Sequence, residues 1–142
     1  MLAPGGEAID IPAALTGVAL GGAAGGMLRH LVATGVERLC GAGFPWGTLA
    51  VNVSGCAAAG AMAAALLRRP ELMAAHLWLA AGVGILGSYT TVSSFSLQTV
   101  QLALRSDWGR ATANAAASMA LCGLAAWAGF AAADRLLGGI AA

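Results

Sequence analysis

The sequence contains no lysine and few charged residues of any kind. Charged residues make up 9% of the 142 residues, whereas hydrophobic residues make up 59%. A soluble domain carries about 25% charged residues, so this chain cannot cover its surface with charge, and we expect lipid to surround much of it. Seven arginines against six carboxylates leave a net charge of +1. That balance gives no electrostatic basis for binding nucleic acid.

The chain also lacks the side-chain groupings that most enzymes and metalloproteins require. Cys40, Cys56 and Cys122 are widely spaced and form no Cys-x-x-Cys motif, which argues against zinc and redox chemistry. Neither a carboxylate pair nor a Ser/His/Asp set is found within the apolar segments. We therefore expect that the protein is not an enzyme.

Four apolar segments are long enough to cross a bilayer, which takes about 20 residues. They are residues 13–36, 44–67, 72–104 and 111–133. The residues before them include acidic side chains but no basic one, unlike a secretory signal. We interpret residues 1–12 as a mobile N-terminal tail that ends with a proline in the first turn of a helix. Residues 13–142 then form one membrane unit of the all-α class, with four transmembrane helices.

The third segment is longer than a single straight pass needs, and it contains the hydroxyl-rich stretch GSYTTVSSFS at residues 87–96. Ser and Thr lower helix propensity and can bond back to nearby carbonyls, while glycine lets the backbone leave the helix. Irregular backbone at membrane depth is tolerated only where protein buries it or water reaches it. Two interpretations follow from composition alone. One is a helix broken near residues 87–91 whose bared carbonyls and hydroxyls coordinate something. The other is a continuous helix whose hydroxyls bond to their own turn.

Neutral polar side chains recur in the later segments, which contain no Asp, Glu or Lys. A proton-coupled transporter usually needs an ionisable group within the membrane. The neutral groups in the second and fourth segments are four residues apart, which keeps them on one helical face. They are Thr48 and Asn52, then Asn114, Ser118 and Cys122, with Thr90, Thr91, Ser93 and Ser94 in the third segment. Such a track can replace the hydration of a small ion, and its N–H and O–H donors suit an anion.

Several polar and aromatic residues also have a purely structural interpretation. Ser118 is favoured as a hydrogen-bonding contact between helices. Asn52, whose amide is costly to bury unpaired, is favoured as a functional group. Arg29 either concentrates anions at a pore mouth or extends to the interface as an anchor. Phe95 either packs against its neighbours or turns its positive ring edge toward an anion.

Arginine is divided almost evenly between the two sides of the predicted membrane. One side has Arg68, Arg69 and Arg135, and the other has Arg29, Arg38, Arg105 and Arg110. Because orientation follows the bias of basic residues, this distribution sets no preference. A chain of this kind can insert both ways, and opposite copies can pair as an antiparallel homodimer. The alternative is that one orientation wins for other reasons.

Three stretches resemble the Fluc (CrcB) family of fluoride channels. The GAAG of residues 22–25, followed by Arg29, is similar to their glycine-rich first helix. PWGTLAVNVSG at residues 45–55 resembles their second-helix signature. GSYTTVSSFS at residues 87–96 resembles their third-helix block, G-G-x-T-T-F-S-T-F-S. The resemblance covers all four segments in order, from residue 17 to residue 137.

The resemblance implies an antiparallel, dual-topology dimer of four-helix subunits in the bacterial plasma (inner) membrane, with two narrow fluoride pores. It also implies a structural sodium ion at the dimer centre, which is not transported and is held by the backbone carbonyls of Gly87 and Thr90. The family's pore asparagine and threonine correspond to Asn52 and Thr48. The predicted fluoride pathway consists of Asn52, Phe95, Thr48, Thr91, Ser94, Ser118, Asn114 and Val92, with Arg29 in the vestibule.

The sequence departs from the family pattern at three places. Val92 stands where the first of two pore phenylalanines is expected, and Ser88 replaces the second glycine of the break. Asn114 and Cys122 alter a fourth-helix track that is often Tyr-xxx-Ser-xxx-Ser.

These observations predict a passive, fluoride-selective channel that exports the anion and so relieves its toxicity. Its expected partners are fluoride, the bilayer and either an inverted second copy or a homologous second subunit. Two alternatives are a small dual-topology exporter of organic cations, which needs a membrane carboxylate missing here, and a non-conducting homologue that needs a partner subunit. Val92 gives some support to the last.

Overall fold

The segments predicted as unbroken spans each form a single long helix. A computed structural model describes residues 10–70 and 75–138 of the chain. In it, the unbroken helices are α1 (Ile11–Cys40), α2 (Trp46–Arg68) and α6 (Trp108–Gly138). With a rise of about 1.5 Å per residue, each is long enough to cross a hydrocarbon core of about 30 Å. All three are also apolar enough to do so.

The third segment is interrupted, as one of the two interpretations of its composition requires. Its first part consists of α3 (Ala75–Trp78), the π-helical stretch η2 (Leu79–Leu86) and the short α4 (Gly87–Tyr89). Its second part is α5 (Val92–Leu104). The prediction of a broken third helix is therefore confirmed. The described residues include no β-strand.

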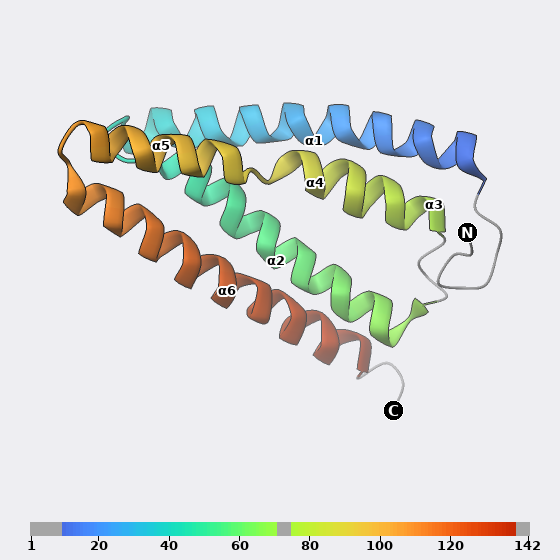
Figure 1. The fold of residues 1–142 in the computed structure, drawn as a ribbon. Coiled ribbons are helices and arrows are strands. Elements are labelled where there is room, and N and C mark those ends of the chain that lie inside the picture. The colour runs from blue at the N-terminus through green and yellow to red at the C-terminus, as the bar shows by residue number, and fades with distance from the viewer. Residues whose placement is uncertain (1–9, 71–74, 139–142) are drawn as a thin grey trace.

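The four passes alternate in direction. In Figure 1, α1 and the third segment run one way along the bundle, while α2 and α6 run the other way, with α1 and α6 on opposite sides. Near the ends of α2 and α6, Arg68 donates to Asp134 through two hydrogen bonds of 2.5 and 3.0 Å, across 66 residues of sequence. This ion pair places the C-terminal ends of the two parallel helices together. Arg68 and Arg135 lie in the last turns of these two helices, whereas Arg38 and Arg105 lie at the C-terminal ends of α1 and α5, at the opposite end of the bundle.

The helix boundaries differ from the predicted ones by a few residues. Helix α1 begins at Ile11, before the predicted start of the membrane unit at residue 13, because Asp10 caps it by accepting a hydrogen bond from the Ala13 amide at 3.4 Å. Proline stands in its first turn as expected. Residues 1–9 of the predicted tail lie outside the described residues. Helix α6 extends beyond both ends of its predicted span.

Small residues bring the helices into backbone contact. A Cβ atom on Gly25 of α1 would overlap the carbonyl of Ile85 in η2, and one on Gly60 of α2 would overlap the carbonyl of Ala126 in α6. Any larger residue at either position would force the helices apart. Close approach through small residues is the usual way in which helices associate in lipid.

Large apolar side chains lie on the outside of the bundle. Leu20, Met27, Val92, Met119 and Trp127 are between 64% and 79% exposed. Water-soluble monomers rarely expose contiguous apolar surface on this scale. Lipid or another membrane protein must therefore cover these side chains.

Candidate functional site

The helix break is formed by two extended residues. Thr90 has φ −77° and ψ 155°, and Thr91 has φ −151° and ψ 115°. Before the break, the amide and the hydroxyl of Thr90 both donate to the Leu86 carbonyl at 3.0 Å. After it, the Thr91 hydroxyl caps α5 by accepting from the Ser94 amide at 3.2 Å. The hydroxyl-rich stretch thus ends one helix and begins the next.

Asn52 on α2 takes over hydrogen bonds that the interrupted helix cannot make. Its Oδ1 accepts from the Thr91 amide at 2.8 Å, and its Nδ2 donates to the Thr91 carbonyl at 2.9 Å. Because Thr91 is only 7% exposed, leaving these groups unpaired would cost about 1–3 kcal/mol each. Gly55, nearly one turn further along α2, makes room for the break, since a Cβ there would overlap the Thr90 methyl group.

The break brings together helix ends of opposite polarity. The last four carbonyls of a helix and its first four amides have no partner within that helix. Here the carbonyls are those of residues 87–90, and the amides are those at the start of α5. A helix C-terminus favours a cation and an N-terminus favours an anion. The two sides of this break therefore favour ions of opposite charge.

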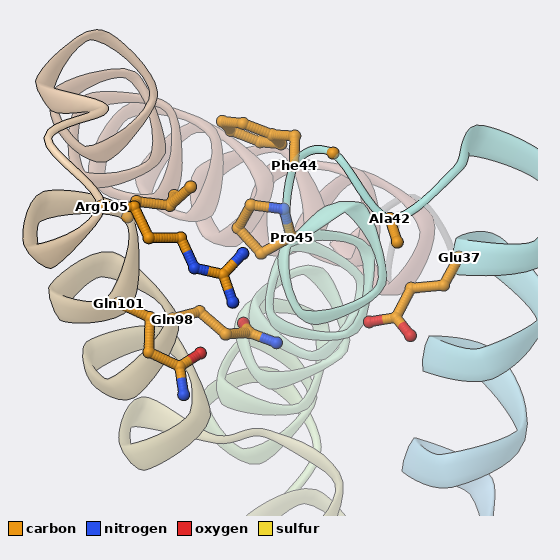
Figure 2. A pocket seen from close by; sticks show the side chains of 9 residues that line it. Glu37, Ala42, Phe44, Pro45, Gln98, Gln101 and Arg105 are labelled. Carbon is orange, nitrogen blue, oxygen red and sulfur yellow. The ribbon is translucent and has the colours of Figure 1, made fainter.

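Three cavities follow one another from one end of the bundle to the break. The outer cavity, of 340 Å³, lies beside the loop between α1 and α2 and is lined by Ala42 and Arg105, among others (Figure 2). It shares Glu37 and Gln98 with the middle cavity, of 460 Å³. The middle cavity shares Thr91 with the break cavity, of 530 Å³. Shared lining residues thus connect the end of the molecule to the break.

Most of the predicted pathway residues line two of these cavities. The middle cavity is lined by Arg29, Thr48, Thr91 and Ser94. The break cavity is lined by Asn52, Thr91, Val92, Phe95 and Ser118, together with Gly87 and Thr90. Thr91 is the member common to both. The structure therefore brings together residues that are far apart in the sequence.

Asn114 lies away from these cavities. It is 2% exposed, and its Nδ2 donates to the Thr99 hydroxyl at 2.8 Å, which links α6 to α5. The Thr99 hydroxyl in turn donates to the Phe95 carbonyl at 2.7 Å. Asn114 thus contacts the pathway residues indirectly, through the helix that carries Phe95.

Gln98 is a candidate pathway residue that the sequence analysis did not identify. It lines both the outer and the middle cavity, and Figure 2 shows its side chain pointing into the outer one. Its Oε1 is buried without a hydrogen-bond partner within the described part of the chain, which is rare for a buried polar atom. The signal was present in the sequence, because a glutamine in an apolar segment is as costly to bury as Asn52.

Charged groups of both signs line the outer part of this route. Figure 2 shows the Arg105 guanidinium and the Glu37 carboxylate both directed into the outer cavity. Arg29 lines the middle cavity, next to the break. Beyond Arg29, the residues that line the break cavity are all uncharged. An ion that moved from the outer cavity to the break cavity would pass from a region with charged side chains into a neutral one.

Comparison of the sequence with known proteins identifies the family of this chain. Residues 16–130 match the family described as CrcB-like protein, Camphor Resistance (CrcB). The chain belongs to this family. The CrcB match covers the three unbroken helices in whole or in part and the entire broken segment. With its apolar helices, the chain is a multi-pass protein of the inner membrane.

Curated relatives of this CrcB protein carry a functional name. The chain is 44% identical to the fluoride-specific ion channel FluC of Geobacter sulfurreducens over 119 residues, which are 84% of this chain and 95% of that protein. It is 44% identical to FluC of Paramagnetospirillum magneticum, over 82% of this chain and 91% of that protein. It is 46% identical to FluC 2 of Rhodopseudomonas palustris, over 84% and 92% of the two chains. These relatives are named as ion channels rather than as enzymes.

Proposed function

We propose that this protein is a passive, fluoride-selective channel that lets cytoplasmic fluoride leave the cell. The observation that carries the proposal is the break at Thr91, where two cavities meet and which Asn52 holds open. The relatives named as fluoride-specific channels support the choice of ion. Neutral hydrofluoric acid enters a cell in acidic surroundings and dissociates inside. A pore for the anion then lets the trapped fluoride leave the cell.

Selectivity would come from neutral donors rather than from a charged filter. The middle cavity offers the hydroxyls of Thr48, Thr91 and Ser94, and it approaches the positive end of α5. Such donors replace water around a small anion without binding it so tightly that it cannot leave. Phe95 lines the break cavity beyond Thr91, where its ring edge can solvate the anion. Arg29 attracts anions to this entrance.

The conducting form would be an antiparallel dimer of two chains with dual topology. The near-equal division of arginines between the two predicted sides of the membrane supports insertion in both orientations. The break also lies at the surface of the single chain, since Gly87 and Val92 beside it are exposed. A partner seated there would close the break cavity into a conduit. A homologous second subunit is the alternative partner.

A structural sodium ion would fit at the centre of such a dimer. The carbonyls of Gly87 and Thr90 belong to the group that the helix end leaves without intrahelical partners. Carbonyl oxygens are hard ligands suited to a hard cation, and the helix C-terminus adds a negative field. Two carbonyls from each of two inverted chains would supply four oxygen ligands. The ion would hold the two breaks together and would not be transported.

The proposal is tested by fluoride efflux from liposomes that contain the purified protein. Asn52→Ala and Phe95→Ile should each lower the efflux rate by at least about tenfold, a loss of roughly 1.4 kcal/mol in transition-state stabilisation. Thr112→Val is the matched control, because the Thr112 hydroxyl bonds only to carbonyls of its own helix. Chemical cross-linking should show that all three variants still form dimers. Unchanged efflux in both pathway variants would refute the assignment of the pore.

A further inference from the structure

Three sulfur-containing side chains line the break cavity: Cys56, Met119 and Cys122. All three cysteines of the chain are free thiols, and the third, Cys40, is exposed at the end of α1. The wide spacing of the cysteines in the sequence argued against zinc and redox chemistry. The fold brings two of them to the same cavity from different helices.

The packing of α2 against α6 places the two thiols opposite each other. Arg68 and Asp134, which pair near the ends of these parallel helices, are 66 residues apart in the sequence. Gly60 and Ala126, whose backbones touch, have the same separation. One turn earlier on both helices, the same separation relates Cys56 to Cys122. Both cysteines line the break cavity. Met119 lies three residues before Cys122 and therefore on the same face of α6.

We propose that Cys56 and Cys122, with the Met119 thioether as a third ligand, form a binding site for a soft monovalent metal ion such as Cu(I) or Ag(I). Thiolate and thioether sulfur favours ions of this class. Zinc needs four ligands, and the described residues contain no group of three or more His, Cys, Asp or Glu side chains that could hold a metal. Ions that accept two or three sulfur ligands fit this cavity best.

The neutral lining of the cavity determines the protonation change on binding. Because its lining residues carry no charge, a complex without net charge is favoured over a charged one. When the monovalent ion binds, one S–H bond breaks, and the metal–thiolate bond that forms replaces a bond from the ion to water. The proton passes to water, and the second cysteine binds as a neutral thiol. One proton is thus released for each ion bound, and no oxidant is involved.

Retention of silver during dialysis tests this site without any measurement of fluoride transport. Protein with Cys40→Ser is loaded with silver nitrate in chloride-free detergent buffer and dialysed against millimolar glutathione. A chelating pair outcompetes a monothiol through its high effective concentration, so about one Ag⁺ per chain should remain. Adding Cys56→Ser or Cys122→Ser should lower the retained silver by at least about tenfold. Met119→Leu should lower it less. Silver retention that is unaffected by both serine changes would overturn the proposal.

X-ray absorption at the silver edge tests the same proposal without altering the cavity. The silver-loaded Cys40→Ser protein should show at least two sulfur neighbours for each bound ion. A spectrum with one sulfur neighbour, or with only nitrogen and oxygen neighbours, would overturn the site even if a cysteine variant failed to fold. Calorimetry in two buffers of different ionisation enthalpy should show about one proton released per ion.

Discussion

Asn52 and Thr91 form a closed pair of hydrogen bonds across two helices: the asparagine amide pairs with both backbone groups of the threonine, at 2.8 and 2.9 Å. This pairing replaces bonds that an unbroken helix would make within itself. It explains how an extended residue can be buried in the middle of a spanning segment. It also gives Asn52 a structural task in addition to its proposed place on the pathway.

Asn52→Asp should make the stability of the protein depend on pH. A protonated aspartic acid has the shape of asparagine and keeps both a donor and an acceptor for Thr91, whereas an ionised one loses the donor and buries a charge. The variant should approach wild-type stability at low pH and lose it as the pH rises, by about 1–3 kcal/mol. Thermal unfolding in detergent from pH 4 to pH 8 measures this. Asn52→Leu, the control, should be destabilised equally at every pH; parallel curves for the two variants would contradict the role of the amide.

Val92→Phe should raise fluoride efflux without lowering stability. The resemblance to Fluc channels places a phenylalanine at this position, and Val92 is 76% exposed at the start of α5, so a larger ring meets no obstacle within the chain. A second ring edge beside Phe95 would add a favourable site for the anion. We expect an increase of about two- to tenfold in efflux from liposomes, which corresponds to about 0.4–1.4 kcal/mol of transition-state stabilisation. Loss of efflux on this substitution would show that the pathway does not pass Val92.

The two charged residues of the outer cavity should act on anion flux in opposite directions. Glu37→Gln removes a charge that repels fluoride and should increase efflux, whereas Arg105→Gln removes one that attracts it and should decrease efflux. Both effects should shrink as the salt concentration rises, because screening is strong beyond about 10 Å at 0.1 M salt. Fluoride efflux measured at low and at high potassium sulfate concentration tests both effects. Equal effects of the two changes, or effects unaltered by salt, would place the route elsewhere.

The orientation of the chain in the membrane should respond to small changes in its arginines. Arg69→Gln with Arg135→Gln would leave a single arginine, Arg68, at one end of the bundle, and the bias should then fix one orientation. Reporters active on only one side of the membrane, fused to the C-terminus, should detect both orientations in the wild type. The double variant should activate only one reporter. A wild-type chain that activates only one reporter would contradict dual topology.

The sequence predicted the helices and the break because both depend on local composition. Apolar length determined α2 and α6 to within a few residues at most boundaries, and the run of hydroxyls between glycines located the interruption. Asn52 was identified because an unpaired amide is costly in any apolar segment. These properties need no knowledge of which helices touch.

Other features depended on contacts between distant segments and could not be predicted. Asn114 and Ser118 are both neutral polar residues on one face of the fourth segment. Of the two, Ser118 lines the break cavity, whereas Asn114 bonds to Thr99 and lines none of the three cavities. Likewise, the proximity of Cys56 and Cys122 follows from the register of α2 against α6, which is set by glycine contacts.

The ratio of fluoride efflux to chloride efflux in a purified system distinguishes a fluoride-selective channel from the alternatives. Liposomes that contain only this protein are loaded with equal fluoride and chloride, and efflux of each ion is followed with a selective electrode after a potassium ionophore is added. We expect rapid loss of fluoride while chloride is retained. Fluoride release no faster than from protein-free liposomes, or chloride release at a similar rate, would contradict it.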